Sequence, residues 1–110
     1  MTNNRIDKLQ IRISEHVSTW IVLNKSTDIN LIVTTIHHVV VSKDLSHAKV
    51  FITSANDTQA ACQELNAHKG QIRLFLSHKM SLKKVPELQF YIDHQFATAQ
   101  RVNNLLDQQK

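Results

Sequence analysis

Glycine and proline are nearly absent from this chain, which limits the folds it can adopt. Among its 110 residues there is one glycine, Gly70, and one proline, Pro86. Both residue types favour turns and interrupt regular structure, so we expect long helices and strands joined by short loops. An apolar fraction of 42% is enough for one buried core. The length suits one compact domain and is too short for two, so residues 1–110 are expected to form a single domain.

Hydrophobic periodicity predicts several helices. In residues 5–24 apolar side chains recur every three or four positions, as on one face of a helix. A second helix is expected at residues 58–68, after polar residues able to cap it. Gly70 then interrupts the helical pattern, and a third helical run follows before Pro86. Residues 96–108 have the pattern of a terminal helix.

Three segments are predicted to be strands. Residues 32–41 are rich in Ile, Val and Thr, while residues 47–53 and 88–92 alternate in polarity. A short turn joins the first two strands, which predicts an antiparallel hairpin. Two helices separate the second strand from the third, and this crossover permits parallel pairing. The order α-β-β-α-α-β-α therefore predicts an α+β fold, with a three-stranded mixed sheet packed on helices. The few aromatic side chains, Tyr91 among them, are expected to share the core.

Positive charge is concentrated in one part of the chain. The net charge is +4, which favours polyanionic partners. From Leu65 to Pro86 there are five cations and no acidic residue. Attraction to phosphate is electrostatic and independent of base sequence, so this basic block suits RNA binding. The alternative is an ordinary solvated helix face.

Three blocks of sequence resemble a known family. They are residues 41–53 (VSKDLSHAKVFIT), residues 70–76 (GQIRLFL) and residues 80–90 (MSLKKVPELQF). Together with their spacing and the opening pattern RIDKL at residues 5–9, they resemble bacterial ribosome-binding factor A over most of the chain.

The resemblance implies a KH-like fold of type II. In this family a helix–kink–helix, usually with the sequence Ala-x-Gly, replaces the KH nucleic-acid loop. Here the stretch is His68-Lys69-Gly70, in which glycine matches and histidine replaces alanine. Many members carry Asp-Pro-Arg after the first helix, whereas this chain has Thr27-Asp28-Ile29-Asn30.

The resemblance also implies a function. Members of the family bind 16S rRNA of the free or immature small ribosomal subunit and assist its late maturation, including processing of the rRNA 5′ end. They matter most in the cold, and a ribosome-associated GTPase promotes their release. On this basis we expect a cytoplasmic, monomeric, non-enzymatic protein that needs no cofactor.

The residues expected to contact RNA are mostly cations near the predicted kink. Gly70 would allow a close approach of the backbone or a positive φ, and a helix beginning there would favour phosphate. Arg73 is assigned the largest role, so that Arg73→Ala should weaken binding without affecting folding. The candidates are Lys69, Gly70, Arg73, Lys79, Lys83 and Lys84, with Lys43 in the hairpin turn and Arg5, Lys8 and Arg12 on the first helix. Lys43, and Lys49 on the predicted sheet, are the weaker candidates.

Several candidates have a purely structural alternative. Gly70 can be a helix C-cap. Lys79 can extend along the apolar stripe of its own helix. The cations of the first helix can form a solvated face, and Lys43 can be an ordinary turn residue.

No catalytic constellation is visible in the sequence. A single glycine excludes a P-loop and a G-x-G-x-x-G motif, and there is no G-x-S-x-G. The lone cysteine, Cys62, can form no internal disulfide or Cys-based metal cage and is typical of a reducing compartment. His37 and His38 are adjacent on a predicted strand and should point to opposite faces, so we expect no metal site. Nothing approaches the ~18 apolar residues of a membrane span.

Two other functions remain open at this stage. One is a protein–protein adaptor that uses the outer face of the sheet or the first helix. The other is an unrecognised small enzyme. Binding that weakens steeply with salt distinguishes RNA recognition from an adaptor role.

Overall fold

The computed structural model describes residues 4–24, 31, 33–80 and 84–95. The described elements follow the predicted order, and those for which bounds were predicted begin and end within about two residues of them. The helix predicted at residues 96–108 lies outside the described residues. The elements are α1 (Asn4–Asn24), β1 (Thr34–Val41), β2 (His47–Ser54), α3 (Thr58–Ala67), α4 (Lys69–Lys79) and β3 (Glu87–Ile92).

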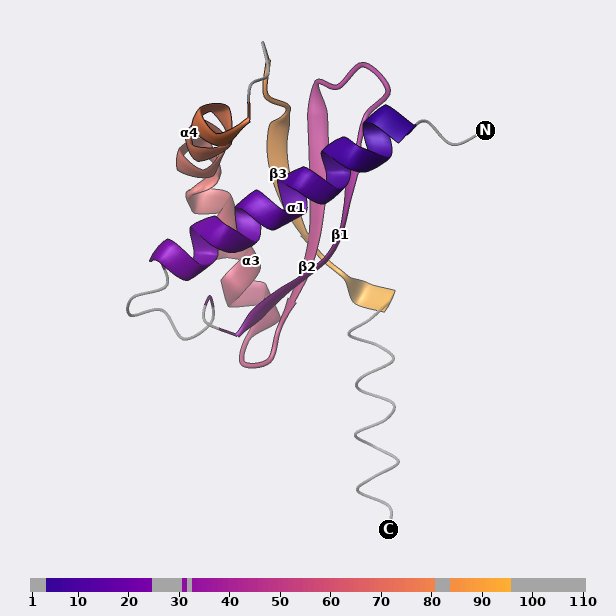
Figure 1. The fold of residues 1–110 in the computed structure, drawn as a ribbon. Helices are drawn as coiled ribbons and strands as arrows, with labels where there is room; N and C mark the ends of the chain where they lie inside the picture. Colours follow the sequence, from indigo (N-terminus) through magenta and orange to yellow (C-terminus); the bar gives the residue numbers. More distant parts are fainter. Residues whose placement is uncertain (1–3, 25–30, 32, 81–83, 96–110) are drawn as a thin grey trace.

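The three strands form one mixed sheet in the order β1-β2-β3, as predicted (Figure 1). β1 pairs antiparallel with β2 through the hairpin, and β2 pairs parallel with β3. The parallel pairing follows from the α3–α4 crossover, which returns the chain to the same end of the sheet before β3 begins.

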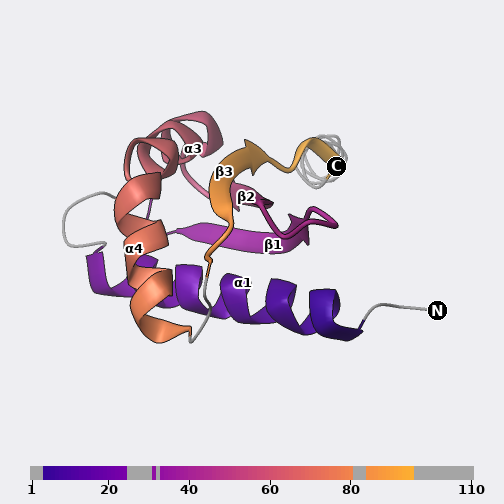
Figure 2. The same ribbon diagram turned by 90° about the horizontal axis from the view of Figure 1, so that it is seen from above.

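The helices cover one face of this sheet. α1 packs against β1 and α4, whereas α3 packs against β2 and β3. Figure 2 shows α1 along one side of β1 and the α3–α4 pair beside β3, so that no labelled helix lies on the opposite side of the sheet. The core between the layers is fully buried at Ile13 and Val17 of α1, Val50 and Ile52 of β2, Leu65 of α3, Ile72 and Leu76 of α4, and Phe90 of β3.

Two aromatic side chains do not lie in the core, contrary to expectation. Tyr91 is 40% exposed and Phe51 is partly exposed. Successive side chains of a strand point to opposite faces. Because Val50 and Phe90 face the helices, their neighbours Phe51 and Tyr91 face outward.

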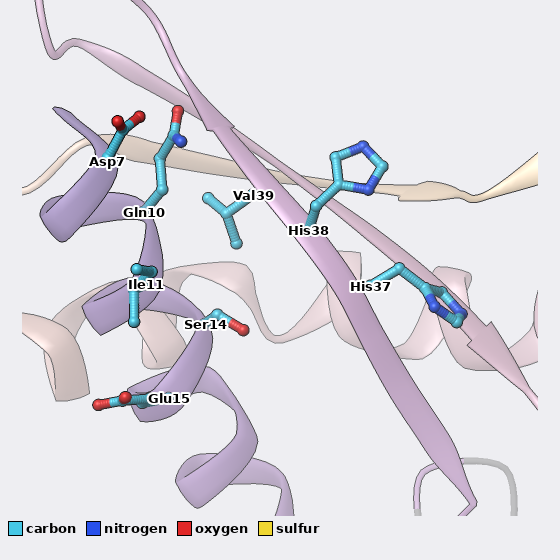
Figure 3. A pocket seen from close by; sticks show the side chains of 8 residues that line it. All are labelled: Asp7, Gln10, Ile11, Ser14, Glu15, His37, His38 and Val39. Atoms are coloured by element: carbon cyan, nitrogen blue, oxygen red, sulfur yellow. The ribbon is translucent and has the colours of Figure 1, made fainter. Parts of the chain in front are cut away.

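A β-bulge overturns the expected orientation of the two adjacent histidines. The β1–β2 register shifts between Ile36 and His38, which leaves His37 as an extra residue. The His37 Nε2 atom lies 2.7 Å from Thr53 Oγ1, and the His38 ring stacks on Phe51. Figure 3 shows both imidazoles on one side of β1, with Val39 on the other. The prediction of opposite faces was wrong because strict alternation fails at a bulge.

Asp44 organises the turn between β1 and β2. Its Oδ1 accepts hydrogen bonds from Ser46 Oγ at 2.7 Å, Ser42 Oγ at 2.7 Å and the Ser46 backbone N–H at 3.1 Å. These donors, with the Ser46 hydroxyl first, hold the pKa of the Asp44 carboxyl well below its ordinary value. Leu45 has a φ of 62°, the left-handed region that a tight turn requires.

Candidate nucleic-acid interface

The kink between α3 and α4 lies at His68 and not at Gly70. α3 ends at Ala67 and α4 begins at Lys69, with His68 serving as the cap of both at φ −103° and ψ 10°. Gly70 is the second residue of α4 and does not have a positive φ, and a Cβ added there would meet nothing within 4 Å. The predicted positive φ at Gly70 and the alternative C-cap role are therefore both wrong.

His68 contacts the neighbouring helices through both its backbone and its ring. The His68 backbone N–H donates to the carbonyl oxygens of Glu64 and Leu65, at 3.2 and 3.1 Å, which ends α3. The ring Nδ1 lies 2.9 Å from the Glu64 carbonyl oxygen. The imidazole also packs against the Trp20 indole of α1, with 5.7 Å between ring centroids. Histidine in place of alanine therefore gives this kink contacts to α1 and α3 that a methyl group cannot make.

Lys69 and Arg73 lie one turn apart on the side of α4 that faces β3. Lys69 Nζ donates to Gln89 Oε1 at 3.2 Å. The Arg73 guanidinium donates to the Val85 carbonyl oxygen from Nε at 3.2 Å and from Nη2 at 2.9 Å. Arg73 thus fastens α4 to the segment that enters β3. The expectation that Arg73→Ala leaves folding unaffected does not fit this geometry, because the variant loses both hydrogen bonds.

The other cations of the basic block are divided by the fold. Lys84 is exposed and precedes Val85, so it lies close to Arg73. Lys79 is about 120° from Arg73 around the helix, on the other flank of the buried stripe. Its Nζ lies 5.5 Å from the centroid of the Phe75 ring, as the structural alternative for Lys79 anticipated. Lys83 lies outside the described residues.

A hollow of about 280 Å³ runs beside β3, next to the kink. We call it the β3 groove. Its cations are Lys49 of β2 and Lys69 of α4, and its single acid, Glu87, lies 3.7 Å from His47 Nδ1. Two cations against one partnered acid make the groove suitable for a phosphate. The lining residues are His47, Ala48, Lys49, Lys69, Glu87, Leu88, Gln89 and Tyr91.

Lys49 was only a weaker candidate in the sequence, as a lysine on the predicted sheet, and the structure places it in the lining of the groove. It occupies an outward position in the alternation of β2, and in the parallel register its partner is Gln89, which binds Lys69. Lys49 and Lys69 therefore meet at the groove only because β3 pairs with β2.

The free edge of β3 is closed at Phe90 by α3. Asn66 Nδ2 donates to the Phe90 carbonyl oxygen at 3.0 Å, and the Phe90 N–H donates to Asn66 Oδ1 at 2.9 Å. Cys62 Sγ lies 3.3 Å from the same carbonyl oxygen, and burial raises the pKa of its thiol, so this is a structural cysteine. The Phe90 backbone groups on this edge therefore already have partners within the protein.

The remaining predicted contacts lie elsewhere on the surface. Lys43 is exposed in the β1–β2 turn. Arg5, Lys8 and Arg12 are on α1, which packs on β1 and α4. None of these four residues lines the β3 groove.

A second hollow, of about 420 Å³, lies between α1 and β1 (Figure 3). It is lined by the acids Asp7 and Glu15 and by no lysine or arginine, so it does not suit phosphate. Among the described residues, no three histidine, cysteine or acidic side chains are arranged to hold a metal ion. Within the same residues, no helix is long and apolar enough to cross a membrane.

Comparison with known proteins identifies the family. The sequence profile of Ribosome-binding factor A matches residues 5–106. The chain belongs to the ribosome-binding factor A family. The family consists of ribosome assembly factors and not of enzymes, in keeping with the resemblance in the sequence blocks.

The alignments of this chain with individual relatives differ in length and in sequence identity. A ribosome-binding factor A of Xanthomonas euvesicatoria is 33% identical over 105 residues, which are 94% of this chain and 80% of that protein. That of Dichelobacter nodosus is 42% identical over 69 residues, which are 59% of this chain and 57% of that protein.

Solved structures of ribosome-binding factor A have the same fold. The crystal structure of the protein from Thermus thermophilus superposes with a TM-score of 0.73 at 20% identity, covering 79% of this chain and 93% of that one. A homology model of Thermus thermophilus ribosome-binding factor A, fitted into a cryo-EM map of its 30S complex, gives a TM-score of 0.65 at 20% identity, covering 74% of this chain and 88% of that one. The predicted α+β fold of KH type II is thus confirmed.

Proposed function

We propose that this chain binds 16S rRNA of the immature small ribosomal subunit and assists its late maturation, including rRNA 5′-end processing. We also propose that this activity supports growth in the cold. The observation that carries the proposal is the family match, which spans residues 5–106. A Thermus relative of the same fold has been fitted into a map of a 30S complex, which supports the small subunit as the partner.

The β3 groove is the part of the surface that we assign to rRNA. Lys49 and Lys69 line it, while Arg73 lies one turn after Lys69 on α4 and is bonded to Val85, the residue that follows Lys84. None of these four cations forms an ion pair with an acid among the described residues. Their charges are therefore available to phosphates, whose attraction supplies most of the sequence-independent affinity for RNA.

Three finer features belong to the same proposal. We infer that the chain acts as a monomer in the cytoplasm and that a ribosome-associated GTPase promotes its release from the mature subunit. All three are consistent with family membership.

Co-sedimentation with immature small subunits, mature small subunits and joined ribosomes tests the function. We expect selective association with the immature subunits. Equal binding to all three, or to none, contradicts the proposal.

Two double variants that remove the same charge locate the interface. Lys49→Ala with Lys69→Ala removes two cations from the groove, and Lys8→Ala with Arg12→Ala removes two from α1. We expect the groove variant to lose at least tenfold in affinity for immature subunits and the α1 variant to lose much less. The reverse ranking would move the interface to α1, and unchanged, salt-independent binding by both would favour a protein adaptor.

A further inference from the structure

We propose that the outer face of the sheet stacks an unpaired RNA base at one end of a row of three aromatic rings. The row, called here the aromatic row, consists of His38 of β1, Phe51 of β2 and Tyr91 of β3. This inference rests on the proposed function and adds to it the kind of nucleotide that the face recognises.

The three rings form one stack that crosses all three strands. The register places His38 opposite Phe51 and Phe51 opposite Tyr91. The His38 and Phe51 ring centroids are 4.4 Å apart with planes inclined by 16°, and those of Phe51 and Tyr91 are 5.7 Å apart with planes inclined by 27°. Phe51 is therefore enclosed between two rings, whereas each end ring has only one neighbour in the row.

The ends of the aromatic row are accessible because β1 and β3 are the edges of the sheet. The His38 side chain is 52% exposed and Tyr91 is 40% exposed. Within the described residues, no labelled helix covers this face (Figure 2). A planar group can therefore continue the stack beyond an end ring. Any of the four bases can stack on an aromatic side chain, since every base has a π face.

Charge selects the Tyr91 end. Lys49 Nζ lies 5.8 Å from the centroid of the Tyr91 ring, and Lys69 lines the same groove. At the other end, His38 Nδ1 lies 3.6 Å from the carboxylate of Asp93, an acid that disfavours phosphate. A base stacked on Tyr91 would thus have its flanking phosphates within reach of two lysines.

The combination of a partly exposed end ring and adjacent cations fits an unpaired nucleotide better than a duplex. In a duplex the base faces are already stacked on one another, and recognition proceeds through the backbone and groove edges. An unpaired base offers its faces along the whole strand, whereas a duplex exposes a base face only at its two ends. The ligand class is therefore single-stranded RNA with an accessible base.

Equilibrium binding of two labelled strands to the full chain tests the inference. The first is a single-stranded oligouridylate of twelve nucleotides, and the second is a strand of equal length and charge in which every base is missing. We expect Tyr91→Leu to weaken binding of the oligouridylate about tenfold and to leave binding of the abasic strand unchanged. Tyr91→Phe, which keeps the ring, should bind both strands as the unaltered chain does.

The outcomes separate this inference from the proposed function. The inference is overturned if the unaltered chain binds both strands equally or binds neither, or if Tyr91→Leu binds oligouridylate within twofold of the unaltered chain. It is also overturned if Tyr91→Leu loses immature subunits but keeps oligouridylate, because the row would then contact protein. Failure of the Lys49 and Lys69 double variant to reduce subunit binding counts instead against the assigned interface.

A second substitution protects the test against loss of folding. Thermal unfolding should show that Tyr91→Leu folds, because the side chain is on the open face. If it does not fold, Tyr91→Thr keeps a β-branched residue at the strand position and removes the ring. The same selective loss of oligouridylate binding is expected.

Discussion

His68 and Gly70 lie two positions apart at the kink and have different roles. His68 provides the bend through its backbone conformation and its contacts with Glu64 and Trp20. Gly70 is a helical residue with open space where its Cβ would be. Glycine destabilises a helix relative to alanine, because it loses more conformational entropy on folding. A physical reason for glycine here is that it lets a phosphate approach the start of α4 without obstruction.

Gly70→Ala is expected to increase the free energy of unfolding by about 0.5–1 kcal/mol, because it reduces the conformational freedom of the unfolded chain. Urea unfolding followed by circular dichroism measures the change. Affinity for immature subunits should fall in the same variant if RNA approaches the backbone there. A destabilised variant would contradict the helical role of Gly70.

The elements are held together at their ends by polar side chains. Arg73 fastens α4 to the entry of β3, Asn66 closes the edge of β3, and Asp57 caps α3 by accepting from the Ala60 N–H at 3.0 Å. The β1–β2 hairpin is closed in the same way by Asp44. The connections between the elements are short, because the chain has one glycine and one proline. Each of these polar contacts fixes the end of an element at such a connection.

Asp44→Asn is expected to make the protein less stable at neutral pH. The folded state lowers the pKa of this carboxyl, so ionised Asp44 stabilises the hairpin above its unfolded pKa of about 3.9. That contribution is lost as the pH falls through the lower folded value. The stability difference between the two proteins should therefore shrink on acidification, as measured by urea unfolding at several pH values.

A Ser46→Ala background provides the control for this pH dependence. The Ser46 hydroxyl is the foremost cause of the lowered pKa. In its absence Asp44→Asn should have a smaller effect. An equal effect in both backgrounds would show that the turn does not depend on the Ser46–Asp44 contact.

At the scale of the whole molecule, the two layers separate three kinds of surface. The helices bury the core face of the sheet, the α1–β1 hollow is lined by two acids, and the β3 groove is lined by two lysines and adjoins the aromatic row. A net charge of +4 therefore understates the local positive charge next to the kink.

Salt dependence measures how this charge is used. If about five phosphates are neutralised, the logarithm of the affinity for immature subunits should fall against the logarithm of salt concentration with a slope of roughly −4. The double variant at Lys49 and Lys69 should reduce that slope by about one to two. A slope near zero for the unaltered chain would show that protein contacts dominate.

Much of the fold was predictable because its determinants are local. Periodicity located α1, the two hairpin strands and β3, and the polar residues before α3 indicated its cap. The kink was assigned to Gly70, two residues too late. At the break His68 packs against Trp20, a residue of another helix, and local sequence contains no trace of that contact.

The sequence alone determined the order of the elements, the α+β class and the concentration of cations before Pro86, since helical and strand periods and charge are properties of neighbouring residues. Only the tertiary structure decided which cations meet. It separated Lys79 from Arg73, gave Arg73 a carbonyl partner and brought Lys49 to Lys69. It also aligned His38, Phe51 and Tyr91. The one-residue bulge in β1 and the parallel pairing of β3 with β2 decide which side chains of these distant segments share a face.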